Sequence, residues 1–277
     1  MREKITNYIK SYIHEADAFG LIPGIWREPL VTFGNADSEV WNDLRQLVHP
    51  DHDLPGEVLP GAKTVIAYFL PFSKEIGNSN RKGRLSSVEW AKAYEKTNAA
   101  IVELNAKLIA FLREEGYRGA VSKEAGSYDP NILKSKWSQR HLAYYCGLGT
   151  FGINNMLITA AGCCGRIGTV VSDVEVDHDQ VIAEEYCLRK RDGSCGACIR
   201  RCPSGALTQE GYDRQLCNNL CDDNAAVHVG YVDTPSYTLD NSEETLIGSN
   251  VCGKCLVGVP CAYHIPKKRK KIKNTCS

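Results

Sequence analysis

Hydrophobic side chains recur at helical spacing in three parts of the chain. Near the N-terminus the apolar positions follow i, i+3, i+4, i+7, i+8 and i+11, which predicts an opening helix with one face formed by Ile5, Tyr8, Ile9, Tyr12, Ile13 and Ala16. A longer pattern predicts a second helix whose apolar face carries Trp90, Tyr94, Ile101, Leu104, Leu108 and Leu112. Ser86 and Glu89 have the spacing of a capping box for this helix, and Gly116 is its predicted end. A third helix is predicted over residues 131–145.

Two segments have the continuous apolar, β-branched character of buried strands. One runs from Thr64 to Leu70 and is stopped by Pro71, and the other runs from Arg166 to Ser172. Residues 20–62 contain many Pro and Gly residues and are predicted to be mostly loop. Because helices and strands alternate irregularly, residues 1–180 are predicted to form a layered, mixed α/β domain.

The rest of the chain has a different character. Residues 181–265 are rich in cysteine and poor in periodic hydrophobic pattern, so we expect a small second domain whose fold depends on what the cysteines hold. Residues 266–277 are predicted to be a basic tail, since six of the seven positions from Lys267 to Lys273 are Lys or Arg.

Composition narrows the choice of protein class. The chain has 277 residues, with 33 basic and 33 acidic side chains, which argues against a protein whose whole surface binds polyanions. A hydrophobic content of 43% excludes global disorder. No apolar run approaches the ~18 residues that a membrane span needs, and the N-terminus lacks the apolar stretch of a secretory signal. We therefore expect a cytoplasmic protein without a membrane partner.

The 13 cysteines are unusual for such a chain. None occurs in the first 145 residues, and most lie between Cys187 and Cys261. A chain of this length needs no disulfide staples, so clustered cysteines in a reducing compartment point to metal ligation.

The spacing of the cysteines is typical of iron–sulfur ligands. Cys195, Cys198 and Cys202, with Pro203, form C-x2-C-x3-C-P, which is the last three-quarters of the run found in bacterial two-cluster ferredoxins. The further cysteine of such a run would stand at position 192, which is Asp, so we interpret Cys187 as the displaced first ligand and residues 189–193 as a small inserted loop.

Two-cluster ferredoxins cross-connect their ligands, and this likeness implies two 4Fe–4S sites in the chain. One takes Cys187, Cys195, Cys198 and Cys261, and the other takes Cys202, Cys217, Cys252 and Cys255. Cys221 is a rival to Cys217. Zinc is the alternative metal, but Cys198 and Cys252 are much further apart than the two halves of a zinc ribbon. The cysteines predicted not to be ligands are Cys146, Cys163, Cys164 and Cys276.

A Gly-rich turn, Gly147-Leu-Gly149-Thr-Phe-Gly152, matches G-x-G-x-x-G. A dinucleotide fingerprint requires a strand before the first glycine, whereas the preceding segment is predicted to be helical, which disfavours a nicotinamide site. The glycines are predicted to allow the backbone to approach a flat or bulky ligand closely.

Several segments together resemble epoxyqueuosine reductases. They are Leu59 to Ile66, Ser127-Tyr128-Asp129-Pro130 through Trp137, the Gly-rich turn with Asn154 and Asn155, Leu157 to Thr159, Gly165 to Asp173, and the two-cluster segment that follows. The resemblance covers about residues 55–265. It implies a cobalamin in the α/β domain, electrons supplied through the two 4Fe–4S clusters by an external donor of the ferredoxin or flavodoxin type, and reduction of an epoxide on a modified tRNA base.

The resemblance also implies roles for individual residues. The cobalamin-binding residues would be Gly147, Gly149, Thr150, Phe151, Gly152, Asn154, Asn155 and Thr159. Asp129 would be the proton donor, with Tyr128 as the alternative donor. Burial against a corrin would raise the pKa of Asp129, which suits a general acid. The other interpretation is that Asp129 is only the N-cap of a helix.

The chain ends near residue 277, without the helical-repeat region that often extends the tRNA enzyme. We therefore expect a short paralogue with an unassigned substrate, tRNA being one possibility. The alternative function is a non-catalytic, ferredoxin-type electron carrier, or a reductive activator of another corrinoid protein.

Overall fold

The computed structural model describes residues 1–19, 24–229 and 248–267 of the chain. The first half contains α1 (Arg2–Phe19), β1 (Leu30–Asn35), η1 (Glu39–Asn42), α2 (Asp43–Leu47), α3 (Pro55–Val58), β2 (Thr64–Pro71), α4 (Lys74–Ser79), α5 (Val88–Glu114) and β3 (Gly119–Ala120). The second half contains α6 (Gln139–Tyr145), β4 (Gly149–Phe151), β5 (Leu157–Thr159), β6 (Gly165–Ser172), α7 (Leu188–Asp192), α8 (Ala197–Arg201), α9 (Arg214–Val227) and η2 (Lys254–Leu256). The predicted basic tail after Lys267, and Cys276 within it, lie outside the described residues.

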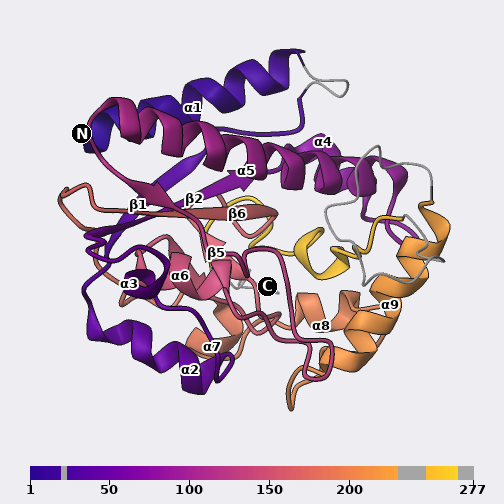
Figure 1. The fold of residues 1–277 in the computed structure, drawn as a ribbon. Coiled ribbons are helices and arrows are strands. Elements are labelled where there is room, and N and C mark those ends of the chain that lie inside the picture. The colour runs from indigo at the N-terminus through magenta and orange to yellow at the C-terminus, as the bar shows by residue number, and fades with distance from the viewer. Residues whose placement is uncertain (20–23, 230–247, 268–277) are drawn as a thin grey trace, which may run out of the picture.

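The centre of the fold is a four-stranded antiparallel sheet in the order β1-β2-β6-β3 (Figure 1). β2 and β6 pair along their whole length, from Thr64 opposite Ser172 to Pro71 opposite Gly165. All eight residues of β2 are buried, so the continuous apolar run is the central strand that the sequence predicts.

Alternate residues of β2 face two separate hydrophobic layers. Ile66 and Tyr68 pack into the core formed with α1 and α5, whereas Val65 and Phe69 pack into a second core that contains Trp137. The phenol of Tyr68 is fully buried and donates a hydrogen bond to Asn105 Oδ1 at 2.7 Å. The mixed α/β fold class predicted from the sequence is therefore confirmed.

The two long helices predicted from periodicity are present, but the cap of the second is displaced by one residue. The N-cap of α5 is Ser87, whose Oγ accepts a hydrogen bond from the backbone N–H of Trp90. Ser86 Oγ instead lies within hydrogen-bonding distance of Asn224 Oδ1 in α9, at 2.7 Å, and of the carbonyl of Val251, at 3.0 Å. The predicted capping box at Ser86 is wrong because a tertiary contact uses that hydroxyl.

Two other expectations fail. Residues 24–62 hold more loop than regular structure, as expected, but they also include β1, which completes one edge of the sheet. The cysteine-rich part includes α9, a helix of 14 residues that the sequence pattern did not predict. Only the last turns of the predicted 131–145 helix form, because residues 129–134 make a bridged turn in which Leu133 has a φ of 52°.

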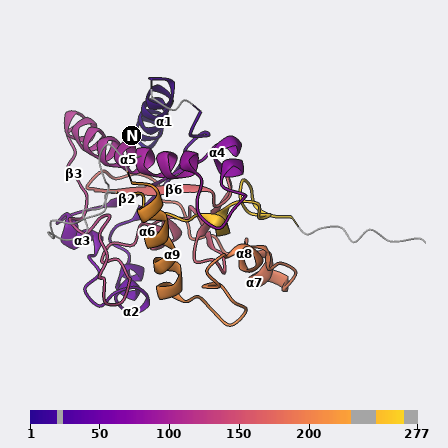
Figure 2. The ribbon, with the colours of Figure 1, turned by 90° about the vertical axis from the view of Figure 1, so that its right-hand side faces the viewer.

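The cysteine-rich segments gather at one end of the sheet, beside the N-terminal end of α5 (Figures 1 and 2). Side chains from both parts of the chain belong to one hydrophobic core, in which Leu207 and Val257 join Ile9 and Leu104. The division at residue 180 into two domains stays a prediction. Within the described residues, no helix combines the length and the apolar character that crossing a membrane requires.

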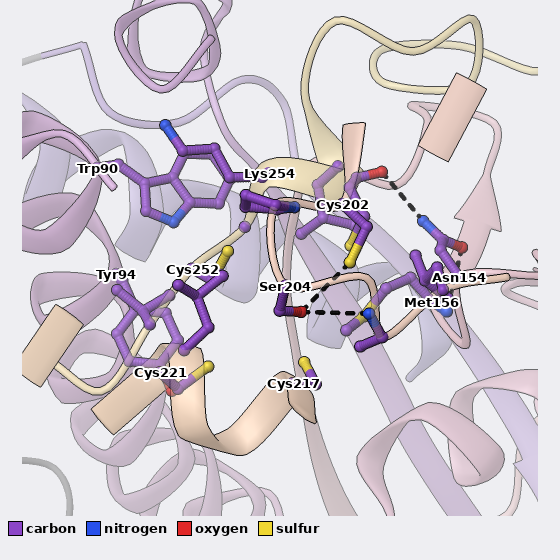
Figure 3. Close-up of a pocket in the computed structure, with 18 of the residues that line it drawn as sticks. Trp90, Tyr94, Asn154, Met156, Cys202, Ser204, Cys217, Cys221, Cys252 and Lys254 are labelled. Atoms are coloured by element: carbon purple, nitrogen blue, oxygen red, sulfur yellow. Dashed lines mark hydrogen bonds between the residues drawn. The ribbon is translucent and has the colours of Figure 1, made fainter. Parts of the chain in front are cut away.

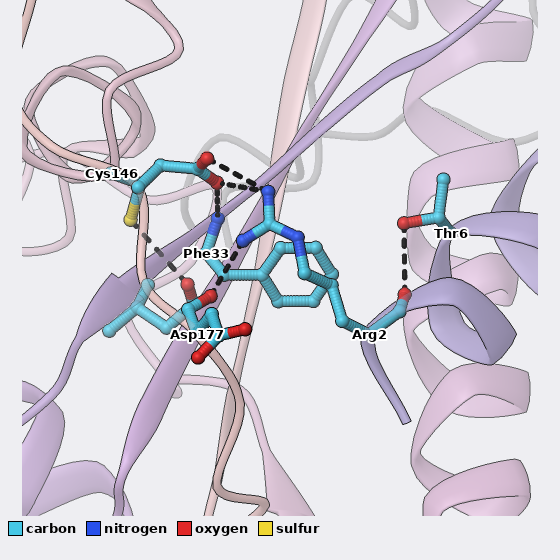
Figure 4. Close-up of polar contacts among 7 residues, drawn as sticks. Arg2, Thr6, Phe33, Cys146 and Asp177 are labelled. Carbon is cyan, nitrogen blue, oxygen red and sulfur yellow. Dashed lines mark hydrogen bonds and ion pairs between the residues drawn. The ribbon is translucent and has the colours of Figure 1, made fainter.

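The first residues of α1 are tied to the edge of the sheet by one carboxylate (Figure 4). Asp179 accepts a bidentate hydrogen bond from Arg2 at 2.8 Å and a further bond from the backbone N–H of Phe33 at 2.9 Å. The guanidinium of Arg2 also lies 4.5 Å from the centre of the Phe33 ring and donates to the carbonyl of Asp177.

We expect Asp179→Ala to lower the free energy of unfolding by about 1–3 kcal/mol, because it removes a charge-assisted pair and the acceptor of the Phe33 N–H. Asp177→Ala is the matched control, since Asp177 offers Arg2 only its backbone carbonyl. Urea denaturation of both variants measures the difference. Equal decreases in the free energy of unfolding would show that the Asp179 carboxylate does not hold α1 against the sheet.

Candidate functional site

The cysteines of the second half line two cavities. Cys187, Cys195, Cys198 and Cys261 line the first cavity. Cys202, Cys217, Cys221, Cys252 and Cys255 line the second cavity (Figure 3). These are the two sets into which the spacing divides the predicted ligands, with Cys221 added to the second.

Short helices distribute the sulfurs between the two cavities. Cys198 lies within α8, and Cys202 caps its C-terminal end, so a helix of five residues supplies one sulfur to each cavity. Cys187 is the N-cap of α7, which ends at Gly193 with a φ of 72°. The loop predicted at residues 189–193 is therefore mostly a helical turn between the first two cysteines of the set.

The segment after the Gly-rich turn separates the cavities. Asn154 is buried and lines both of them. Its Nδ2 donates a hydrogen bond to the carbonyl of Cys255 at 3.2 Å, and its Oδ1 accepts one from the backbone N–H of Met156 at 3.4 Å. The two cavities are therefore adjacent, with one side chain forming part of both walls.

The surroundings of the second cavity suit an anionic, sulfur-rich group. Its volume is about 210 Å³. Trp90 lines it, and the buried Nε1 of this residue has no hydrogen-bond partner in the described part of the chain. Lys254 is 1% exposed, and its Nζ donates to the carbonyls of Asn80 and Lys82. A buried cation is costly without a counter-charge, which a thiolate-bound cluster would supply.

The first cavity is narrower, at about 20 Å³. Its four thiols are the donor set that an iron–sulfur cluster requires. Among the residues that the structure describes, no three His, Cys, Asp or Glu side chains converge closely enough to hold a single metal ion. The sulfurs surround cavities instead, as the ligands of a larger group do.

Cys217 and Cys221 both reach the second cavity because they lie one helical turn apart on α9. A hydrogen bond from Cys221 is the main cause that lowers the pKa of Cys217, and the hydroxyl of Tyr212 contributes a second bond in the same direction. The structure therefore brings both rival ligands to this site.

Two of the predicted cobalamin-binding glycines pack against protein. Gly147 has a φ of 71°, and a Cβ there would meet the carbonyl of Gln180. A Cβ at Gly149 would meet the carbonyl of Ile158 in the paired strand β5. Both glycines therefore allow another segment to approach the backbone closely, as predicted. At these two positions the approaching atoms belong to the protein and not to a ligand.

The other predicted cobalamin-binding residues make scaffold contacts as well. Thr150 Oγ1 accepts a hydrogen bond from the N–H of Tyr186 at 3.0 Å, which positions the segment leading into Cys187. Thr159 is buried and donates to the carbonyl of Gly162. The ring of Phe151 lies 4.7 Å from that of His141. The remaining three are Gly152, Asn154 and Asn155. Gly152 packs against the side chain of Asn154, and Asn155 has a φ of 58°.

Asp129 lies in the bridged turn and does not cap a helix, so the N-cap interpretation is wrong. Its Oδ1 accepts the N–H of Asn131 at 2.8 Å, and its Oδ2 lies 3.4 Å from His49 Nε2. The hydrogen bond from the Asn131 backbone is the main cause that lowers the pKa of Asp129. The rise in pKa was expected only for a carboxyl buried against a corrin. Tyr128 is partly buried, and neither residue lines a sulfur cavity.

The fold also brings together polar residues that no sequence motif had indicated. His52 Nε2 accepts the N–H of Ser138 at 2.9 Å, and burial lowers the pKa of His141 to about 4, so that it is neutral at pH 7. Arg140 donates to the carbonyl of Asn155 and lies 3.7 Å from the sulfur of Met156, which lines the second cavity. No motif marks these residues, because only the tertiary structure brings them together.

Comparison with known proteins points to one family. No protein-family model matches the chain. It is 28% identical over 175 residues to the epoxyqueuosine reductase of Bacillus cereus and 29% identical to that of Bacillus anthracis. The matched part is 60% of this chain and 41% of each relative, so the match spans less than half the length of those proteins. The epoxyqueuosine reductase of Leadbetterella byssophila is 26% identical over 164 residues.

Solved structures of the same enzyme share the fold. The epoxyqueuosine reductase of Bacillus subtilis matches with a TM-score of 0.57 at 19% identity, over 96% of this chain and 66% of that protein. The enzyme of Streptococcus thermophilus matches with a TM-score of 0.56 at 15% identity, over 98% of this chain and 69% of that protein. These comparisons confirm the resemblance that the sequence segments indicated.

Proposed function

We propose that this chain, a relative of the epoxyqueuosine reductases, is an iron–sulfur reductase with two 4Fe–4S clusters and a cobalamin. The observation that carries the proposal is the pair of adjacent cavities, which between them hold every cysteine that the spacing marks as a ligand. Thiolates at such positions bind clusters that transfer electrons singly.

The arrangement of the two sites supports an electron path. Cys198 in α8 and Cys202 at its C-cap line different cavities, and Asn154 lies in the wall of both. We propose that an external donor of the ferredoxin or flavodoxin type supplies the electrons. Lys254 and the Trp90 N–H favour the anionic cluster at the second site through charge and hydrogen bonding.

We propose that cobalamin, when bound, supplies the reductive chemistry on the substrate. In the Gly-rich segment, Phe151 and Asn155 keep partly exposed side chains and are the ones proposed to contact it. Gly147, Gly149, Thr150 and Thr159 would shape the turn beneath them, as their protein contacts indicate.

The proposed proton donor is Asp129, with Tyr128 as the alternative. In the Bacillus subtilis enzyme, an aspartate-bearing catalytic loop can swing out of the active site. Asp129 likewise lies on a loop, the bridged turn of residues 129–134. Exposed as it is, its carboxyl has a lowered pKa, and burial of the loop against a ligand would raise that pKa toward the value that a general acid needs.

The first substrate to test is a tRNA anticodon stem-loop that carries epoxyqueuosine, since one structural relative was solved with an epoxyqueuosine-modified tRNA stem loop. The second candidate function is a non-catalytic electron carrier or a reductive activator of another corrinoid protein. It is favoured by the contacts of Gly147, Gly149, Thr150 and Thr159, predicted cobalamin-binding residues that pack against the chain itself.

We expect about eight iron and eight sulfide per chain after anaerobic reconstitution. Cys255→Ala should lose about half of both, because it removes a ligand of the second cluster only. Cys146→Ala is the control, since Cys146 is a buried thiol that bonds to the carbonyl of Val65 and lines neither cavity. Elemental analysis and electron paramagnetic resonance measure the outcome, and zinc in place of iron would refute the cluster assignment.

Corrinoid binding separates the two candidate functions. Protein purified without oxygen, mixed with hydroxocobalamin and desalted, is expected to retain corrinoid absorbance. A bacterial two-cluster ferredoxin treated in parallel measures non-specific carry-over. Loss of the absorbance to the level of that control would favour the electron carrier.

Asp129→Asn tests the proton donor, because Asn keeps the acceptor for the Asn131 N–H but cannot supply a proton. We expect both clusters and corrinoid binding to persist while turnover of the stem-loop falls by roughly 10²–10⁴. Asp51→Asn is the control, as Asp51 is an exposed carboxylate two residues from His49, the histidine that lies beside Asp129. Turnover of Asp129→Asn at the wild-type rate would remove Asp129 from the mechanism and make Tyr128→Phe the next variant.

A further inference from the structure

Cys163 is a buried cysteine that neither the spacing nor the proposed cluster sets use. It lies in the turn between β5 and β6 and is 3% exposed. Two backbone hydrogen bonds hold this turn against the end of the cysteine-rich part, from the N–H of Cys163 to the carbonyl of Cys261 at 2.9 Å and from the N–H of Cys164 to the carbonyl of Ala262 at 3.0 Å.

The pairing of these backbones brings two sulfurs together. The thiol of Cys163 donates to Cys261 Sγ over 3.9 Å. Cys261 lines the first cavity, whereas Cys163 does not, so the Cys163 thiol reaches the site only through the Cys261 sulfur. Cys164, the next residue, is also buried but lies beside Arg27 instead of a ligand sulfur.

We propose that Cys163 is a positioning residue for the first cluster, whose thiol donates a hydrogen bond to the sulfur of the ligand Cys261 and thereby raises the reduction potential of that cluster. The inference rests on the proposed function, since it needs a cluster bound at Cys261. A reduced cluster carries one more negative charge than an oxidised one, so a hydrogen bond to its ligand sulfur stabilises the reduced form more.

Removal of the Cys163 thiol should therefore lower the reduction potential of the first cluster. Cys163→Ala is expected to keep the wild-type iron and sulfide content but to make the midpoint of the first cluster more negative. Because the S–H group is a weak donor, we expect the ratio of reduced to oxidised cluster at a fixed potential to fall by up to about tenfold. For a one-electron couple this corresponds to a midpoint that is lower by up to about 59 mV. Cys163→Ser restores a donor and should bring the midpoint back toward the wild-type value.

The measurement is a redox titration of the reconstituted full-length protein followed by electron paramagnetic resonance. The signal that disappears in Cys198→Ala identifies the first cluster. Cys164→Ala is the matched control, because it removes a buried thiol from the same turn without touching a ligand sulfur, and its midpoint should stay unchanged.

Three results would overturn the inference. An unchanged midpoint in Cys163→Ala would give the residue a packing role only, and equal shifts in Cys163→Ala and Cys164→Ala would trace the effect to the turn. Loss of the first cluster from Cys163→Ala, together with its retention in Cys261→Ala, would make Cys163 the ligand. Absence of iron from the wild-type protein would instead refute the proposed function, which keeps the two failures distinguishable.

Discussion

Burial of β2 on both faces is the constraint on which the rest of the structure depends. Because side chains alternate along the strand, one face requires the helical layer of α1 and α5, and the other requires the layer that contains Trp137. β6 completes the backbone pairing of β2. The segment that enters β6 carries Asn154 and Cys163, so the sheet also fixes the position of the wall that borders both sulfur cavities.

The cysteine-rich part packs many of its buried side chains against the sheet and helices of the first part of the chain. Its helices α7 and α8 have five residues each, and its buried side chains join the core of α1 and α5. Such a segment becomes more ordered when several of its side chains ligate one group, because the bonds to that group replace missing hydrophobic contacts. The proposed clusters would in this way hold together sulfurs that lie as far apart in the sequence as Cys187 and Cys261.

The features that could be predicted from the sequence are those governed by local pattern. The buried strand β2 and the helices α1 and α5 follow from hydrophobic periodicity. The two sets of cysteines that line the two cavities are those implied by the likeness to two-cluster ferredoxins, and their role as ligands stays a prediction. The features that the sequence did not predict depend on tertiary contacts. Ser86 bonds to Asn224 instead of capping α5, Gly147 packs against the carbonyl of Gln180, and Asp129 lies beside His49.

Under the proposed function, the buried ammonium of Lys254 would link the stability of the fold to the supply of iron. Two carbonyl oxygens accept hydrogen bonds from this ammonium but carry no net charge that could neutralise it. A bound cluster would supply the missing negative charge, and binding to the folded chain alone raises its apparent stability by mass action. Iron starvation would therefore reduce the amount of folded chain as well as its capacity to carry electrons.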